Sequence, residues 1–246
     1  MKILVCISAT PDTTSKISFK NNDREFNTDN IQFILNPYDE WYALVKALEL
    51  KEKLGGTVTV IHVGPAQNEP MIRKALAIGA DDAVRINDIP FSSYETAHQI
   101  AHYAETQQYD LILLGKETID YQSGEVGSMI AELLSLPYVA FSSQLDIIDG
   151  LATCSRDIEG GVEILEIKLP VVISASKGMA EQRIANMKGI MMAKSKTLLI
   201  IEPIEVVSNA SIMTYSLRPS KKGVKMIEAD HMDELVRMLH EHDKVI

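Results

Sequence analysis

A glycine-containing loop at residues 115–128 carries the strongest candidate chemistry in this sequence. It follows the apolar run Leu111–Leu114 and leads into an apolar helical pattern. Free backbone N–H groups and the dipole at a helix start favour a phosphate, and Gly124 lets the backbone approach one closely. The loop has neither the Walker ending nor the G-x-G-x-x-G pattern. A nucleotide loop and an ordinary glycine-capped loop are therefore equal alternatives from these residues.

The other reactive side chains lack the partners that catalysis or metal binding needs. Ser142 and Ser143 have no histidine and acid at a recognisable spacing, so nucleophilic catalysis has little support. His98 and His102 could share a helical face, but no cysteine or carboxylate cluster completes a metal site. We expect no catalytic residues, no metal and no independent enzymatic activity.

Charge and composition narrow the classes of partner. The formal net charge is −10 and the pI about 5.1, which argues against a nucleic-acid partner. Two cysteines, Cys6 and Cys154, do not indicate a disulfide framework, and Cys6 lies in an apolar run. No apolar run is long enough to span a membrane, and the first residues already resemble a strand. We expect a cytoplasmic protein, and a processed organellar protein would look the same.

The elements around the loop alternate between strands and helices. Apolar runs predict buried strands, and amphipathic stretches between them predict helices. Asn36 is expected to cap the first helix, with Pro37 at its first position. This order predicts an α/β fold, a Rossmann-like parallel sheet of the adenine-nucleotide-binding type with helices on both faces. The expected strands are 3–7, 58–63, 83–86, 111–114, 171–175 and 197–201, and the expected helices are 37–54, 69–78, 92–107 and 124–134.

The pattern changes after Pro137. Residues 139–147 and 151–157 resemble paired strands joined by Asp149-Gly150, which predicts a β-hairpin insertion. Residues 177–196 are polar, rich in methionine and weakly structured; Met187 is expected to protrude, whereas Met191 and Met192 suit a core. We assign residues 1–203 to one nucleotide-binding domain and 204–246 to a C-terminal arm with a short helix at 232–240.

Four stretches together resemble the beta subunit of electron-transfer flavoproteins, along nearly the whole chain. The order and spacing of the four are highly specific. They are Asn36-Pro37-Tyr38-Asp39-Glu40, Gly64-Pro65-Ala66-Gln67 with 75–81, the loop 113–127, and Arg156-Asp157-Ile158-Glu159-Gly160-Gly161-Val162-Glu163 with Lys168-Leu169-Pro170.

This resemblance implies a heterodimer whose alpha subunit carries most of an FAD site. The family carries electrons from acyl-CoA dehydrogenases of fatty acid oxidation, and from similar flavoenzymes, to a quinone oxidoreductase at the membrane. It also implies a structural AMP in this subunit and an arm that packs on the alpha subunit. The implied AMP site comprises Cys6, Asn36, Pro37, Tyr38, Asp39, Val63, Gly115, Lys116, Ile119, Asp120, Gln122, Ser123, Gly124, Glu125 and Val126.

The family also implies residues for flavin contact and docking. Three residues, Thr13, Tyr38 and Asp157, are expected near the FAD or between domains. In well-known members, an aromatic side chain near the flavin occupies the position of Thr13. The recognition loop falls at 177–196, and its anchor falls at Met187, where many members have leucine.

Two alternatives stay open. Electron-bifurcating relatives hold a second FAD in place of AMP, although Asp120-Tyr121-Gln122-Ser123 looks more like the AMP type. A stress-type nucleotide-binding protein of the same fold group would end well before residue 200.

Overall fold

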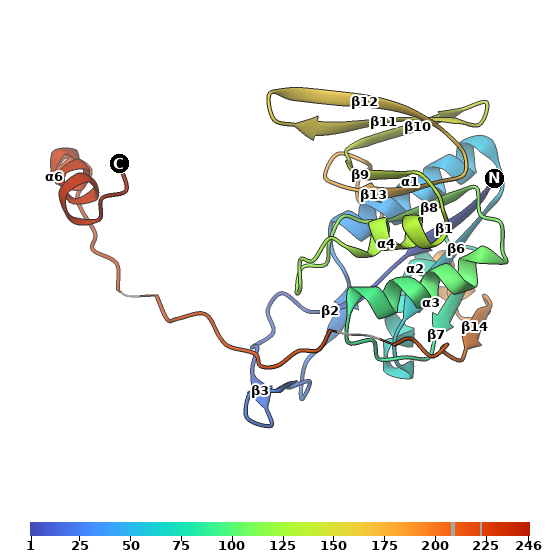
Figure 1. Cartoon of the computed structure of the whole chain (residues 1–246), viewed down its shortest axis with the longest axis horizontal. Helices are drawn as coiled ribbons and strands as arrows, with labels where there is room; N and C mark the ends of the chain where they lie inside the picture. Colours follow the sequence, from blue (N-terminus) through green and yellow to red (C-terminus); the bar gives the residue numbers. More distant parts are fainter. Residues whose placement is uncertain (208–209, 222) are drawn as a thin grey trace.

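A seven-stranded parallel sheet forms the centre of the computed structural model, which describes residues 1–207, 210–221 and 223–246 (Figure 1). All strand pairs within it are parallel. The strands lie in the order β14 (Leu198–Ile201), β7 (Asp82–Ile86), β6 (Thr57–Val63), β1 (Lys2–Cys6), β8 (Leu111–Gly115), β13 (Val171–Ala175) and β9 (Tyr138–Ser142). The predicted Rossmann-like α/β fold is confirmed.

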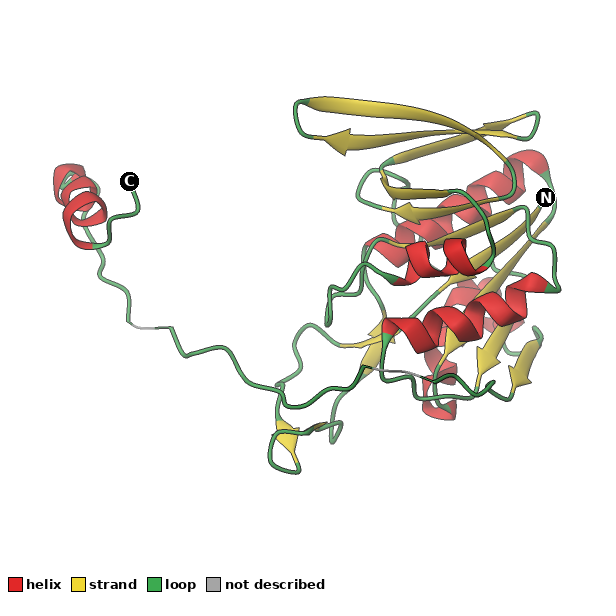
Figure 2. Ribbon diagram, viewed as in Figure 1, coloured by secondary structure: helices red, strands yellow, loops and turns green. Residues whose placement is uncertain are grey.

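Helices cover both faces of this sheet, as its continuous apolar strands require (Figure 2). Ile3 and Val5 point to the face covered by α1 (Asp39–Leu54) and α2 (Glu69–Ile78), whereas Leu4 and Cys6 point to the face covered by α3 (Ser93–Glu105) and α4 (Val126–Leu133). Burying each such side chain contributes about 1.5–3 kcal/mol. Two apolar clusters therefore fix the sheet between the helix pairs.

The first helix starts later than the sequence predicts. It begins at Asp39, and Tyr38 rather than Asn36 occupies the N-cap position. The amide of Asn36 is instead fully buried and hydrogen-bonded to the loop after β8. The capping prediction was wrong because a tertiary contact claims this side chain.

The insertion is larger than one hairpin. Residues 139–147 do not form one strand: β9 belongs to the central sheet, and β10 (Gln144–Ile148) starts a separate antiparallel sheet with β11 (Leu151–Ile158) and β12 (Gly161–Lys168). The chain changes sheets at Ser143. A second hairpin pairs β3 (Phe19–Lys20) with β4 (Glu25–Phe26), and β2 (Ala9–Pro11) pairs with β5 (Phe33–Leu35). A short 3₁₀ turn, η1 (Ala66–Asn68), precedes α2.

The last third of the chain departs most from prediction. Residues 177–196 contain a helix, α5 (Met187–Ala193), and Met191 and Met192 are exposed on it rather than in the core. Strand β14 lies at the sheet edge and is half exposed. Beyond it the chain extends away from the body to α6 (Met232–Arg237) and a π-helical turn, η2 (Met238–His242) (Figure 1).

Candidate functional site

A cleft of about 630 Å³ opens at the carboxyl edge of the central sheet. The chain builds β6 and β7 on one side of β1 and then returns to place β8 on the other side. Ligands of open α/β sheets bind where the strand order reverses in this way. The residues that follow β1 and β8, Ser8 and Lys116, both line the cleft.

The floor of the cleft depends on a close approach of two backbones. At Gly115, the last residue of β8, an added Cβ would lie 2.7 Å from the backbone nitrogen and 2.8 Å from Cγ of Glu40. Only glycine therefore lets the start of α1 pack against the end of β8. This packing brings the side chain of Glu40 into the cleft wall.

Asn36 holds the nucleotide-loop candidate against this floor. Its side-chain Nδ2–H donates to the Glu117 carbonyl at 3.0 Å, and its Oδ1 accepts the Ile119 N–H at 3.0 Å. The side chain is fully buried. A single asparagine thus satisfies two backbone groups of the loop and fixes its first turn.

Glu40 is a buried carboxyl in the cleft wall, only 6% exposed. The Ser8 N–H donates to Oε2 at 2.7 Å, and the Ser8 hydroxyl is hydrogen-bonded to Oε1. Burial raises the pKa of Glu40 to about 8 despite these two hydrogen bonds. The carboxyl is therefore protonated over most of the neutral range and adds little negative charge to the cleft.

His62 and Asn68 form a second buried polar pair at the cleft. The Ile7 carbonyl only accepts, so Nδ1 of His62 carries the hydrogen and donates to it at 2.9 Å. Nε2 then accepts from the Asn68 amide at 2.9 Å. Burial lowers the pKa of His62 to about 4, which agrees with this neutral tautomer. The pair ties the ends of β1 and β6 together.

Two helix starts and several hydroxyls face the cleft. Ser92 caps α3 by accepting the Glu95 N–H at 3.2 Å, and Ser93 lies 3.0 Å from Ser123 between their hydroxyl oxygens. The first backbone N–H groups of a helix have no intrahelical partner, and those at the start of α4 lie beside the lining residues 123–126. Donors for an anion thus come from amides and hydroxyls.

The C-terminal segment covers one side of the cleft. Ile212 and Tyr215 both line it. The Tyr215 ring stacks on Phe19 with centroids 4.9 Å apart, and its hydroxyl lies 3.3 Å from that of Tyr121. The segment is attached further back by Gln99, whose amide makes two hydrogen bonds to the Ile204 backbone, at 2.8 and 3.0 Å.

The predicted AMP residues divide between this cleft and a smaller cavity of about 260 Å³ beside it. Cys6, Val63, Gly115, Lys116, Asp120, Ser123, Gly124, Glu125 and Val126 line the large cleft. Pro37, Tyr38, Asp39, Ile119 and Gln122 line the small cavity, which shares Lys116 and Glu117 with the large one. Asn36 lines neither and holds the loop between them.

The residues predicted near the flavin lie on three separate segments. Thr13 follows β2, Tyr38 precedes α1 and Asp157 is the penultimate residue of β11, and all three are exposed. Tyr38 has φ 68°, a strained conformation for a non-glycine residue, and borders the small cavity. Met187, the predicted anchor, is 73% exposed on α5.

Sequence reasoning missed the polar and aromatic walls of the cleft. Glu40 falls within the resemblance stretch 36–40 but had no predicted role of its own, and the side chains around α3 and the arm had no signal of their own. His62, a polar residue within the apolar strand β6, was the one usable cue. The missed lining residues include Glu40, His62, Asn68, Phe91, Ser93, Thr96, Ile212 and Tyr215.

Among the residues that the structure describes, no three or more His, Cys, Asp or Glu side chains gather as a metal site would require. No helix there combines the length and apolar character needed to cross a membrane.

Comparison with known proteins identifies the family. The electron transfer flavoprotein domain matches residues 25–205. The chain is 36% identical to the electron transfer flavoprotein subunit beta of Bacillus subtilis (strain 168), with full coverage of both chains. It is 35% identical to that of Syntrophomonas wolfei, over 92% of this chain and 90% of the relative, and 32% identical to that of Homo sapiens, over 100% and 99%. The chain therefore belongs to the electron transfer flavoprotein family, among its beta subunits.

Proposed function

We propose that this chain pairs with an alpha subunit as an electron carrier and holds a structural AMP in the large cleft. The dimer takes electrons from acyl-CoA dehydrogenases and similar flavoenzymes and passes them to a quinone oxidoreductase. The FAD, held mainly by the alpha subunit, supplies the redox chemistry. The residues of this chain bind, orient and dock, so the chain itself needs no acid, base or nucleophile.

One observation carries the nucleotide assignment: the cleft lies at the reversal of strand order and is faced by two helix starts. Its volume of about 630 Å³ lies in the ordinary range for small-ligand sites, about 300–1,000 Å³. Because Glu40 is protonated and His62 neutral, the charged side chains that line the cleft are Lys116, Glu117, Asp120 and Glu125. Amides and hydroxyls near Ser123 suit the phosphate, and the apolar ends of β1 and β6 suit the adenine.

The arrangement of residues 177–196 supports the docking role. Ile184, Met187 and Met191 are among the most exposed large apolar side chains of the body of the protein. Methionine adapts to varied apolar surfaces, as one carrier that serves several flavoenzymes requires. Met187 is the proposed anchor.

The nucleotide released by the heterodimer tests this proposal directly. The chain is co-expressed with its alpha partner, the purified complex is denatured with acid, and the released nucleotides are quantified by chromatography. We expect about one FAD and one AMP per dimer. Two FAD and no AMP would establish the bifurcating type instead, and no nucleotide besides one FAD would refute the assignment of the cleft.

A further inference from the structure

An apolar surface stands out from the body of the protein on residues 184–191. Ile184 is 84% exposed, Met187 73% and Met191 71%. Met187 and Met191 are four residues apart on α5 and therefore share one helix face. We call these three side chains the docking surface.

The opposite side of α5 is fixed closely to α2. A Cβ added to Gly189 would overlap the Ala77 carbonyl oxygen, so the two backbones are in contact there. Asn186 caps α5 by accepting the Gly189 N–H at 2.8 Å, and Ala193 is buried beneath the helix. The helix can therefore present only its methionine face outward.

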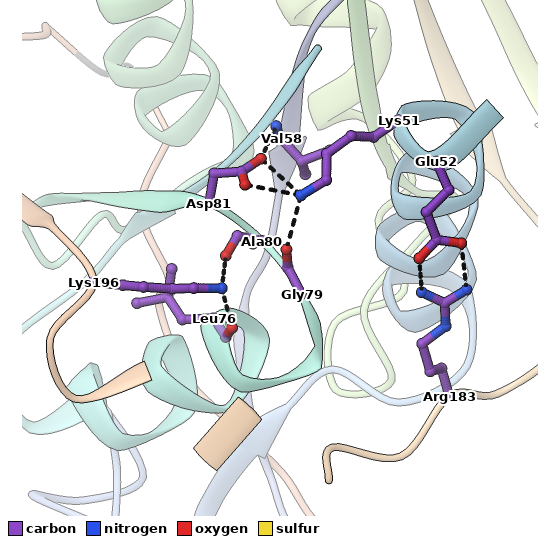
Figure 3. Close-up of polar contacts among 9 residues, drawn as sticks. All are labelled: Lys51, Glu52, Val58, Leu76, Gly79, Ala80, Asp81, Arg183 and Lys196. Atoms are coloured by element: carbon purple, nitrogen blue, oxygen red, sulfur yellow. Dashed lines mark hydrogen bonds and ion pairs between the residues drawn. The ribbon is translucent and has the colours of Figure 1, made fainter. Parts of the chain in front are cut away.

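Two basic side chains fix the end of this segment. Arg73 on α2 donates to the Ala193 carbonyl at 2.9 Å and to the Lys196 carbonyl at 2.7 Å. The Lys196 ammonium donates in turn to the carbonyls of Leu76, at 2.9 Å, and Ala80 (Figure 3). The Arg73 side chain thus satisfies free carbonyls at the end of α5, and the Lys196 side chain satisfies free carbonyls at the end of α2.

The stretch before α5 has much less support. Residues 180–185 have no regular secondary structure. Within the described part of the chain, their only hydrogen bonds are those between Arg183 and Glu52 on α1. The guanidinium binds both carboxylate oxygens, at 2.6 and 3.1 Å (Figure 3).

The anchoring point on α1 is itself held in place. Lys51, next to Glu52, binds the Asp81 carboxylate at 2.8 Å and the Gly79 carbonyl at 3.2 Å. Asp81 also accepts the Val58 N–H at 2.8 Å. The end of α1 is thus joined to the turn that precedes β7, and the Arg183 guanidinium binds the Glu52 carboxylate at this end of the helix (Figure 3).

We propose that Arg183 and Glu52 are positioning residues for docking. Their bidentate pair holds residues 180–185 in place before a flavoenzyme arrives, so association does not have to order this stretch. The proposal rests on the docking role of Met187 described above. It assigns to this ion pair the task of presenting Ile184 and Met187 together.

Paired substitutions in the intact heterodimer test this role. The variants are Glu52→Gln, Arg183→Gln, and the exchange Glu52→Arg with Arg183→Glu. Asp146→Asn is the matched control, because the Asp146 carboxylate is about as exposed as that of Glu52, 52% against 57%, and forms an ion pair with Lys53 of α1 at 2.7 Å. Glu52→Gln and Asp146→Asn change the net charge equally, so long-range steering is matched.

Two readouts separate positioning from a merely structural role. The first is the rate at which proteinase K cleaves the native dimer within residues 180–187, and the second is KM and kcat for reduction by an acyl-CoA dehydrogenase. We expect each single substitution to speed this cleavage and raise KM about two- to fivefold at constant kcat, as loss of an exposed bidentate pair predicts. The exchanged pair should restore both values, and the control should change neither.

Each other outcome counts against the proposal. Unchanged cleavage in Glu52→Gln would show that the pair does not order the segment. Faster cleavage with unchanged KM would show that this order does not serve docking, provided that Met187→Ala raises KM. If Met187→Ala also leaves KM unchanged, the docking role of the whole segment is refuted, and with it the positioning role.

Discussion

Replacing Glu40 with glutamine should make the protein more stable, and increasingly so as pH rises. The ordinary pKa of this carboxyl is 4.5, whereas burial raises it to about 8 in the folded chain. Between these values the folded state keeps the proton and the unfolded state loses it. The contribution of Glu40 to the free energy of unfolding therefore falls by about 1.4 kcal/mol per pH unit as pH rises through this window. This loss levels off above pH 8.

Glutamine removes this titration and keeps an oxygen that accepts the Ser8 N–H. From pH 5.5 to 7.5, the stability advantage of Glu40→Gln should grow by about 2.5 kcal/mol, worked from the two pKa values. Trp41, the single tryptophan, lies next to Glu40 in the buried side of α1 and reports unfolding by fluorescence.

The assay is urea unfolding of the nucleotide-free chain at pH 5.5, 6.5 and 7.5, followed at Trp41. Glu117→Gln serves as the control, because this partly exposed carboxylate lines the same cleft. A constant difference between Glu40→Gln and the unmodified chain over this pH range would refute the buried, protonated state of Glu40.

Three further substitutions test other parts of the site. Gly115→Ala should lower stability by about 1–3 kcal/mol, because its Cβ meets Glu40; thermal melting measures this, and an unchanged midpoint would contradict the close approach. Asn36→Ala leaves two backbone groups of the loop unpaired and should lower the free energy of unfolding by about 1–3 kcal/mol. It should also weaken AMP retention, measured by dialysis and chromatography, and full retention would contradict the role of Asn36 in holding the loop. Met187→Ala should raise KM for a dehydrogenase about tenfold, whereas Met187→Leu should not. Equal KM values for Met187→Ala and the unmodified protein in steady-state kinetics would refute the anchor role of Met187.

The sheet could be predicted from the sequence because its strands are short apolar runs bounded by turns. Because both faces of the sheet are buried, every residue of a strand such as β8 is buried and the strand is a continuous apolar run. The loop after β8 could be found for the same reason, since its position follows from the strand and helix around it. The resemblance then added residue assignments that periodicity alone does not provide.

The rest of the site depends on contacts between distant segments. Asn36 has the local features of a helix cap, yet a loop more than eighty residues away binds its side chain. Tyr215 lines the cleft from an arm whose sequence shows no pattern. The sheet change at Ser143 was missed because β9 and β10 are separated by one residue, and a single alternating run describes both.

The cleft and the docking surface lie at opposite edges of the same sheet. The cleft follows the carboxyl ends of β1 and β8, whereas α5 packs beside Ala77 near the end of α2, just before β7 begins. No residue that lines the cleft belongs to residues 183–196. Under the proposed assignments, substitutions at the docking surface would therefore change the choice of electron donor without altering any residue that lines the nucleotide cleft. Cofactor retention and partner choice could then evolve independently within one small domain.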